Sequence, residues 1–310
     1  MAEERGKRRE GDSAAAEKAP NTGDRGLSQQ PHSPLFAALL LASLAWPALG
    51  QAPAVEQSPD KVVVSNPCYR VALLRTRGGT ISEVALPDGT PVLGGDLLYT
   101  DHGLYPEGNT VGSDKETNAT VQVRREGNRV IVASRGTLRG EGALREPERR
   151  LEYTFTYTFD ASPTIHVRCA ATPSFALAQP TGFFSYLMGV PRFAEWFAKT
   201  AEGLIFQPAG PANGRCFQSA EDPLDLDEPW VGVLLPEGTL IAWSHFGGTP
   251  APSNVFLHES GKGSAGFFCA WVSGAAPADL AAGQPWTADF DLHIWPKAMQ
   301  STVALPAFIG

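Results

Sequence analysis

The stretch RLEYTFTYTFD, residues Arg150 to Asp160, decides the fold class of this chain. Its apolar side chains at positions 151, 153, 155, 157 and 159 alternate strictly with Glu152 and with threonines. Because a strand sends successive side chains to opposite faces of a sheet, this segment predicts a strand with one aromatic face and one polar face. Aromatic and β-branched residues also suit a pleated sheet.

The next segment repeats the pattern after a short turn at residues 161–163. Residues 164–171 (TIHVRCAA) place Ile165, Val167 and Cys169 on one face, and His166 and Arg168 on the other. Two alternating runs joined by a turn are typical of a hairpin. We therefore predict a long antiparallel hairpin at the centre of a large sheet.

The rest of the chain consists of short alternating runs separated by turn residues, such as Pro87-Asp88-Gly89 and Pro236-Glu237-Gly238. There is no alternation of strands with helices. One candidate helix, Pro191–Lys199, carries its aromatic residues at helical spacing. The pattern predicts an all-β fold, an antiparallel two-sheet sandwich of about fourteen strands with little helix.

The N-terminal residues divide into three segments before this domain. Residues 1–33 are polar and charged and are expected to be disordered. Residues 34–50 contain an apolar run of signal-peptide length, followed by a small-x-small cleavage site, with an uncleaved anchor as the alternative. Residues 51–60 are expected to be a linker, and residues 61–310 a single domain. The mature protein is thus predicted to be exported, periplasmic or extracellular, without a membrane span.

Charge and composition exclude several classes of partner. The chain of 310 residues has a net charge of −8 and a pI near 5.3, and only 19% of its residues are charged. The densest basic stretch, residues 145–150 (REPERR), is interleaved with glutamates. A nucleic-acid binder usually carries a basic face, so no nucleic-acid partner is expected. The acidic balance favours neutral over polyanionic ligands.

Four cysteines remain after export, and they show no metal-binding spacing: Cys68, Cys169, Cys216 and Cys269. In an exported protein they permit three disulfide pairings. The alternative is that they are small buried apolar residues. The mid-strand positions of Cys169 and Cys269 favour burial for those two.

Residues 65–93, SNPCYRVALLRTRGGTISEVALPDGTPVL, carry a family resemblance. Asn66, the Gly78-Gly79 turn, Ile81-Ser82 and the Asp88-Gly89 hairpin resemble the opening of the galactose mutarotase-like supersandwich. As a pattern of strands and turns the resemblance extends over most of residues 61–296. It implies a large β-supersandwich that binds carbohydrate on the concave face of one sheet. The implied activities are those of aldose epimerases, polysaccharide lyases and glycoside hydrolases.

The segment Asp96–Glu116 is predicted to be a long loop, and long loops in compact domains are often functional. Within it, His102 to Glu107 (HGLYPE) is similar to a His/Gly–aromatic–Pro loop of exported family members. We predict His102 and Glu107 as catalytic groups, because a His and a carboxylate can form an acid/base pair, and Tyr105 as a substrate contact. Alternatively, the segment is an ordinary solvated loop.

A divalent cation at Asp101, Glu107 and Asp114 is a further reading of this loop, because hard cations prefer oxygen ligands. No other cofactor and no dedicated metal site are expected.

Two further groups of candidate residues lie on predicted strands. His245 is a candidate for catalysis and Trp243, two residues earlier, is expected on the same face, where a sugar ring would stack on it. His166 and Arg168 are predicted to contact substrate if the polar face of the hairpin is the binding face. For each group the alternative is ordinary packing or solvation.

The last predicted strand carries polar residues along one face: Asp289, Asp291 and His293. A salt-bridged sheet edge is the simplest interpretation of this pattern.

The sequence therefore favours an exported protein that binds or acts on an oligo- or polysaccharide. The alternatives are a non-catalytic interaction module of the cell envelope and a purely structural β-domain. No G-x-S-x-G, H-E-x-x-H or P-loop motif is present, so serine-nucleophile and nucleotide chemistry have no support. Whether the protein is an enzyme, and its oligomeric state, are left open.

Overall fold

The computed structural model describes residues 52–100, 111–138, 150–176, 183–200, 203–208, 214–218, 230–249, 254–261, 264–272 and 281–297. All of them belong to one compact unit, residues 45–310, and the predicted leader lies outside the described residues. Every pairing between the described strands is antiparallel, and the helical elements among them are two 3-10 turns, η1 (Arg75–Arg77) and η2 (Ser113–Lys115). The predicted all-β antiparallel fold is thus confirmed.

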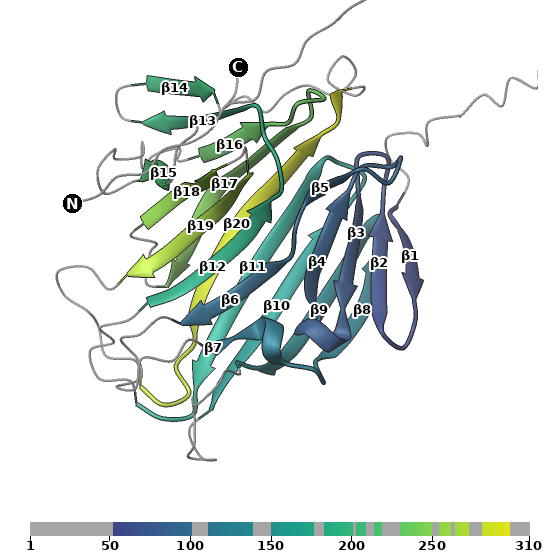
Figure 1. Cartoon of the computed structure of the whole chain (residues 1–310). Coiled ribbons are helices and arrows are strands. Elements are labelled where there is room, and N and C mark those ends of the chain that lie inside the picture. The colour runs from purple at the N-terminus through teal and green to yellow at the C-terminus, as the bar shows by residue number, and fades with distance from the viewer. Residues whose placement is uncertain are drawn as a thin grey trace, which may run out of the picture. The chain divides into compact units, whose positions relative to one another are not determined.

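The largest sheet has nine strands and contains the predicted hairpin of residues 151–173 (Figure 1). In spatial order its strands are β14 (Gly203–Pro208), β13 (Glu195–Thr200), β16 (Trp230–Leu234), β17 (Leu240–Thr249), β20 (Trp286–Trp295), β11 (Thr164–Pro173), β10 (Leu151–Phe159), β9 (Arg129–Thr137) and β8 (Thr120–Glu126).

Two smaller sheets lie on one side of the nine-stranded sheet in Figure 1. The first consists of β1 (Ala54–Gln57), β2 (Lys61–Ser65), β3 (Arg70–Leu74), β4 (Thr80–Ala85) and β5 (Pro91–Leu93). The second consists of β15 (Gly214–Gln218), β18 (Asn254–Gly261), β19 (Ser264–Val272), β12 (Phe183–Val190), β6 (Asp96–Thr100) and β7 (Val111–Gly112). The Gly94 amide donates to the Gly189 carbonyl at 2.7 Å, which links the two sheets into one layer.

The β10–β11 hairpin has the predicted register and burial. Leu151 pairs with Pro173 and Phe159 with Ile165, and burial alternates along both strands. The aromatic rings of Phe155 and Tyr157 are fully buried and stacked, with centroids 5.7 Å apart. Since β9 and β20 flank the hairpin, it lies inside the sheet, as predicted.

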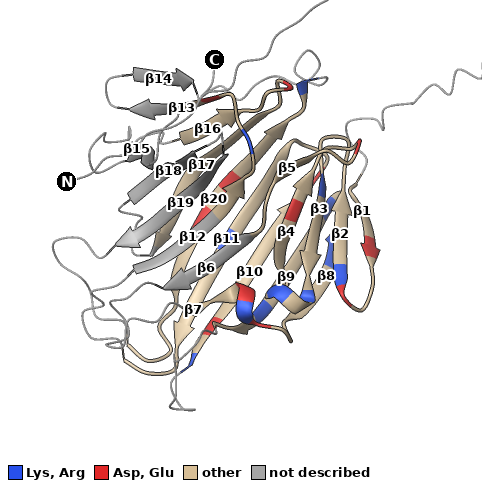
Figure 2. Cartoon of the chain, viewed as in Figure 1, with Lys and Arg blue, Asp and Glu red and all other residues tan. Residues whose placement is uncertain are grey.

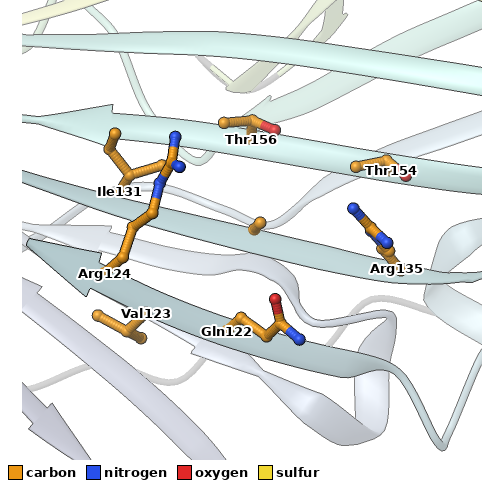
Figure 3. Close-up of a pocket in the computed structure, with 8 residues that line it drawn as sticks. Gln122, Val123, Arg124, Ile131, Arg135, Thr154 and Thr156 are labelled. Atoms are coloured by element: carbon orange, nitrogen blue, oxygen red, sulfur yellow. The ribbon is translucent and has the colours of Figure 1, made fainter.

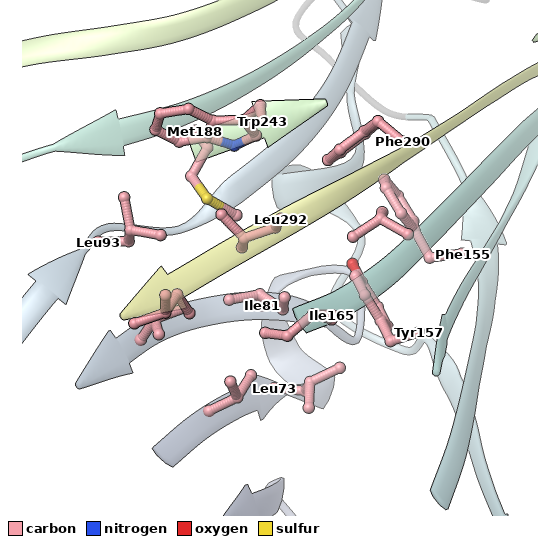
Figure 4. Packing of buried hydrophobic residues seen from close by; sticks show 14 of the residues in the cluster. Leu73, Ile81, Leu93, Phe155, Tyr157, Ile165, Met188, Trp243, Phe290 and Leu292 are labelled. Carbon is pink, nitrogen blue, oxygen red and sulfur yellow. The ribbon is translucent and has the colours of Figure 1, made fainter. Parts of the chain in front are cut away.

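The hydrophobic core lies between the nine-stranded sheet and the two smaller sheets (Figure 4). Leu73 and Ile81 from the five-stranded sheet belong to the same buried cluster as Ile165 and Leu292 from the nine-stranded sheet, and Met188 of β12 contributes from the third sheet. Burial of each such side chain stabilises the fold by about 1.5–3 kcal/mol. The core thus covers one face of the nine-stranded sheet, and part of the opposite face is also buried, around Phe197 and Trp230.

The helix predicted for Pro191–Lys199 is wrong, because this segment contains strand β13 (Glu195–Thr200). Trp196 is buried in the main core, whereas the next residue, Phe197, is buried on the other face against Trp230, with ring centroids 5.2 Å apart. A strand that is covered on both faces carries consecutive aromatic residues, and this spacing resembles that of a helix.

Two other segment predictions need correction. The expected linker at residues 51–60 contains β1, which pairs with β2. The expected loop at residues 96–116 contains β6, β7 and η2, while residues 101–110 lie outside the described residues. Such short strands and 3-10 turns lack the sustained alternation on which the sequence prediction relied.

Candidate functional site

The candidate site lies on the face of the nine-stranded sheet that points away from the core, here called the polar face. Strand register aligns its side chains in two rows across six strands, from β8 to β17. The first row is Arg124, Ile131, Thr158, His166, Asp291 and Ser244, and the second is Gln122, Ala133, Thr156, Arg168, Asp289 and Gly247. Neighbouring strands lie about 4.8 Å apart, so each row spans roughly 24 Å.

Three depressions on the polar face share their walls. One is lined by Arg124, Arg135, Thr154 and Thr156, whose side chains point to the same side in Figure 3. The next shares Arg135 and Thr154 with it and extends toward Glu152 and Thr172. The third shares Thr156 and is lined by Thr158, His166, Arg168, His245, Asp289 and Asp291. Because neighbouring depressions share lining residues, they adjoin one another along the polar face, and together they are called the track below.

Asp291 on β20 connects two exposed histidines in the third depression. Its Oδ1 lies 2.5 Å from Nδ1 of His166, and its Oδ2 lies 2.9 Å from Nδ1 of His245. The side chains of His166 and His245 are 51% and 66% exposed, whereas that of Asp291 is 17% exposed. The carboxylate therefore orients both imidazole rings while their outer edges reach solvent.

His293 lies beneath this pair and is buried. Its Nδ1 is 2.9 Å from Thr164 Oγ1, and its Nε2 is 2.7 Å from Ser244 Oγ. Its ring stacks on Trp295, with centroids 5.0 Å apart. The Ser244 hydroxyl is also 3.0 Å from His245 Nδ1, so it joins the buried histidine to the exposed ones. The four side chains of His166, His245, Asp291 and His293 are called the His–Asp cluster below.

Electrostatics distinguish the members of the His–Asp cluster. The hydrogen bond that His166 donates to the Asp291 carboxylate raises the pKa of His166 above its ordinary value, against the effect of burial. Burial tends to raise the pKa of Asp291, but the hydrogen bond and charge of His166 bring it below its usual range. Burial lowers the pKa of His293 to about 4. At neutral pH the buried His293 ring is therefore neutral, whereas His166 keeps its proton to a higher pH than a free imidazole does.

A β-bulge places His245 on the polar face. The register between β17 and β20 shifts between Ser244 and Gly247, and His245 has a φ of 55°. Positive φ is uncommon for a residue other than glycine. As a result His245 lies beside Ser244, while Phe246 turns inward and packs near Phe290, with ring centroids 6.3 Å apart.

The prediction that Trp243 and His245 share a face is wrong, because the bulge lies between Ser244 and Gly247 and includes His245. The Trp243 side chain is fully buried in the core, so it does not reach the surface on which His245 lies. Simple alternation fails here, because the extra residue in β17 changes which face the following side chains occupy.

The predicted loop site mostly falls outside the described residues. This applies to His102, Tyr105 and Glu107, and to Asp101 of the predicted cation site, and all of these remain predictions. Asp114 is described in η2, where it forms an ion pair with Lys115 at 3.5 Å.

The importance of Asp291 and its buried partners was missed by the sequence interpretation, which placed Asp289, Asp291 and His293 on a salt-bridged edge. The structure instead places β20 inside the sheet, between β17 and β11. The alternation of Asp289, Asp291 and His293 along one strand was the signal in the sequence that could have indicated this cluster. Their partners Ser244 and Thr164 could be found only once the neighbouring strands were known.

No protein-family model matches the sequence, and a comparison with curated proteins gives no match. Solved structures with similar architecture include a galactose mutarotase-like protein from Clostridium acetobutylicum, with 8% identity, coverage of 79% of this chain and 98% of that chain, and a TM-score of 0.48. Galactose 1-epimerase from Lactobacillus acidophilus NCFM has 10% identity, coverage of 78% of this chain and 97% of that chain, and a TM-score of 0.46. An active YidC insertase has 13% identity, coverage of 84% of this chain and 45% of that chain, and a TM-score of 0.35.

The matches include the galactose mutarotase-like fold that the sequence resembles. TM-scores of 0.48, 0.46 and 0.35 carry no activity or residue role from these proteins to this chain.

Proposed function

We propose that this protein binds an oligo- or polysaccharide along the polar face of the nine-stranded sheet. The observation that supports this is the track of three adjoining depressions, lined by threonine, arginine, histidine and aspartate side chains. Sugar hydroxyls both donate and accept hydrogen bonds, and these side chains offer both partners. A track of roughly 24 Å across six strands suits an extended chain better than a single small molecule.

The charge of the track bears on the kind of glycan. Arg135 and Arg168 line the track and have no ion-pair partner among the described residues, whereas Arg124 pairs with Glu126 at 3.2 Å. Guanidinium groups recognise carboxylates in a bidentate manner. We therefore propose that the track accepts uronate-containing glycans as well as the neutral ones that the net charge favours.

We further propose that the third depression transfers protons. His166, held by Asp291, is suited to donate a proton, and Asp289 lines the same depression and is suited to accept one. A pair of this kind serves epimerisation, lyase chemistry and glycoside hydrolysis alike. The second candidate function is a non-catalytic envelope module, which would use the same track for binding alone.

A glycan panel with neutral and uronate-containing polymers tests the binding proposal. We expect binding to at least one polymer and about tenfold weaker binding by Arg135→Ala and Arg168→Ala, because each loses a charged hydrogen bond. Glu83→Gln, at an exposed position of β4 in another sheet, is the matched control and is expected to bind normally. Absence of binding to every polymer contradicts the proposal.

Turnover separates the two candidate functions. For an enzyme, His166→Gln and Asp289→Asn should each abolish release of reducing ends or unsaturated products from the bound polymer while binding persists. A protein that binds the polymer and releases no product in wild-type form is instead the non-catalytic module.

We also propose that the protein is exported, which the apolar run at residues 34–50 and its small-x-small site support. N-terminal sequencing of the protein recovered outside the cytoplasm should begin at Gln51. Recovery only from the cytoplasm with an intact N-terminus contradicts this. Among the described residues there is no helix of the length and apolarity needed to span a membrane.

A further inference from the structure

Part of the His–Asp cluster has the composition of a metal site. Side-chain ligand atoms of His245, Asp291 and His293 all lie within 4.8 Å of one another. We propose that these three side chains bind a divalent transition-metal ion of the Zn²⁺ type. This inference concerns a ligand different from the glycan, and it does not depend on the proposed function.

His293 is oriented as a metal ligand. Its Nδ1 faces Thr164 Oγ1 at 2.9 Å, and its Nε2 faces Ser244 Oγ at 2.7 Å. In the tautomer that donates from Nδ1 to Thr164, the Nε2 lone pair points toward Ser244 and the rest of the cluster. Metal-binding histidines usually donate their second ring N–H to an oxygen, which fixes the tautomer and the ring orientation.

His245 and Asp291 complete the set from the exposed side. His245 Nδ1 lies 2.9 Å from Asp291 Oδ2 and 3.0 Å from Ser244 Oγ, so the Ser244 hydroxyl lies between the two histidines. Ligand atoms around tetrahedral zinc are about 3.3 Å apart. Since His245 Nδ1 and Asp291 Oδ2 are 2.9 Å apart and the whole set lies within 4.8 Å, binding requires a small adjustment of the side chains. The exposed His245 ring can provide it by rotation. Binding through Nδ1 requires the neutral His245 ring to carry its proton on Nε2, so the proton moves from Nδ1 to Nε2 by exchange with solvent.

The types of ligand atom, and the strands and hydrogen bonds that hold them, favour a transition metal. Two imidazoles and one carboxylate suit zinc, nickel or copper, whereas calcium and magnesium prefer oxygen ligands alone. Asp291 and His293 are two residues apart on β20, and His245 comes from the adjacent bulge of β17. The other oxygen of Asp291 stays bonded to His166. Rigid strands and these outer bonds hold the ligands in place, and the exposed side leaves a fourth position for water or a ligand.

Equilibrium dialysis of the full chain against Zn²⁺ alone, after treatment with a chelator, tests the proposal. Wild type should bind one more Zn²⁺ than His245→Ala, and Asp291→Asn should bind at least about tenfold more weakly than wild type. Asp289→Asn is the matched control, because it removes a carboxylate from the same strand and face, and it should bind like wild type.

The design separates metal binding from misfolding and from other histidines. Both His245 and Asp289 are on the surface track, so their variants should keep the wild-type circular dichroism spectrum. The remaining histidines are present in every variant, so the difference between proteins reports this site. Co²⁺ added to wild type should give the intense visible absorption of a tetrahedral site, and His245→Ala should not.

Equal Zn²⁺ stoichiometry in wild type and His245→Ala overturns the proposal, and so does equal loss in Asp289→Asn. Because no glycan enters the assay, its failure is distinct from failure of the carbohydrate proposal.

Discussion

The two faces of the β10–β11 hairpin follow the same alternation but lie in opposite surroundings. One face buries Phe155 and Tyr157 in the core, while the other presents Thr156, His166 and Arg168 to the track. Neighbouring residues along one strand thus contribute to different properties: one to stability and the next to ligand contact. Substitutions at adjacent positions should separate these two properties, and the following predictions test that separation.

The largest effect is expected for Phe155→Ala. The ring is fully buried in the core, so its loss leaves a cavity and should lower the free energy of unfolding by about 3–5 kcal/mol. The adjacent Thr156→Ala lies on the polar face and should change it by less than about 1 kcal/mol. Urea denaturation of both variants measures the difference. Similar losses for the two would contradict the division between the faces.

Asp291→Asn should have the next largest effect, and it tests whether the polar face contributes to stability at the His–Asp cluster. The substitution weakens two hydrogen bonds to His166 and His245, which should lower the free energy of unfolding by about 1–3 kcal/mol in metal-free buffer. Asp289→Asn, which loses no such bond among the described residues, should stay within about 0.5 kcal/mol of wild type. Equal stability of the two variants would show that the cluster is not preformed.

Tyr153→Phe should have a smaller effect. The buried Tyr153 hydroxyl donates to the Gly78 carbonyl at 2.8 Å and ties the nine-stranded sheet to the turn that follows η1. Loss of this bond should cost about 0.5–1.5 kcal/mol, measured by the same denaturation. The Phe ring keeps the apolar contacts, so a loss as large as that of Phe155→Ala would mean that packing, too, has changed.

The smallest effect at neutral pH concerns Cys68. Burial and the nearby Asp160 raise the pKa of this thiol to about 12, so the folded protein keeps it neutral. The thiol of the unfolded chain loses its proton near pH 9, whereas that of the folded protein keeps it up to about pH 12. This group therefore lowers the free energy of unfolding as pH rises from 9 toward 12, and it has no such effect below pH 9. Mass mapping should find Cys68 unmodified by iodoacetamide at pH 7 until the protein is unfolded. Fast labelling of the folded protein would contradict its burial.

The hairpin and the all-β class could be predicted from the sequence because a period of two is a local property. Leu151 to Phe159 shows it without interruption, and the burial follows it residue by residue. The β13 segment could not be assigned in this way, since Trp196 and Phe197 are covered on opposite faces by residues distant in sequence.

The candidate site was predicted only in part for a related reason. His166, Arg168 and His245 were proposed from the sequence, and the structure places all three around one depression. Trp243 was placed on the wrong face, because the bulge depends on how β17 registers against β20. The burial of His293 and its bond to Ser244 likewise depend on strands that are adjacent only in the folded protein.

The bulge at His245 also shifts the inward and outward alternation of side chains along β17 by one residue. Before it, the odd-numbered Ile241 and Trp243 face the main core, and after it the even-numbered Phe246 takes the inward position. A one-residue deletion at this point would exchange the inward and outward positions of the rest of the strand, whereas a substitution would leave them unchanged. Changes in the number of residues should therefore be far less tolerated here than substitutions, because the single extra residue determines which side chains of β17 face the core.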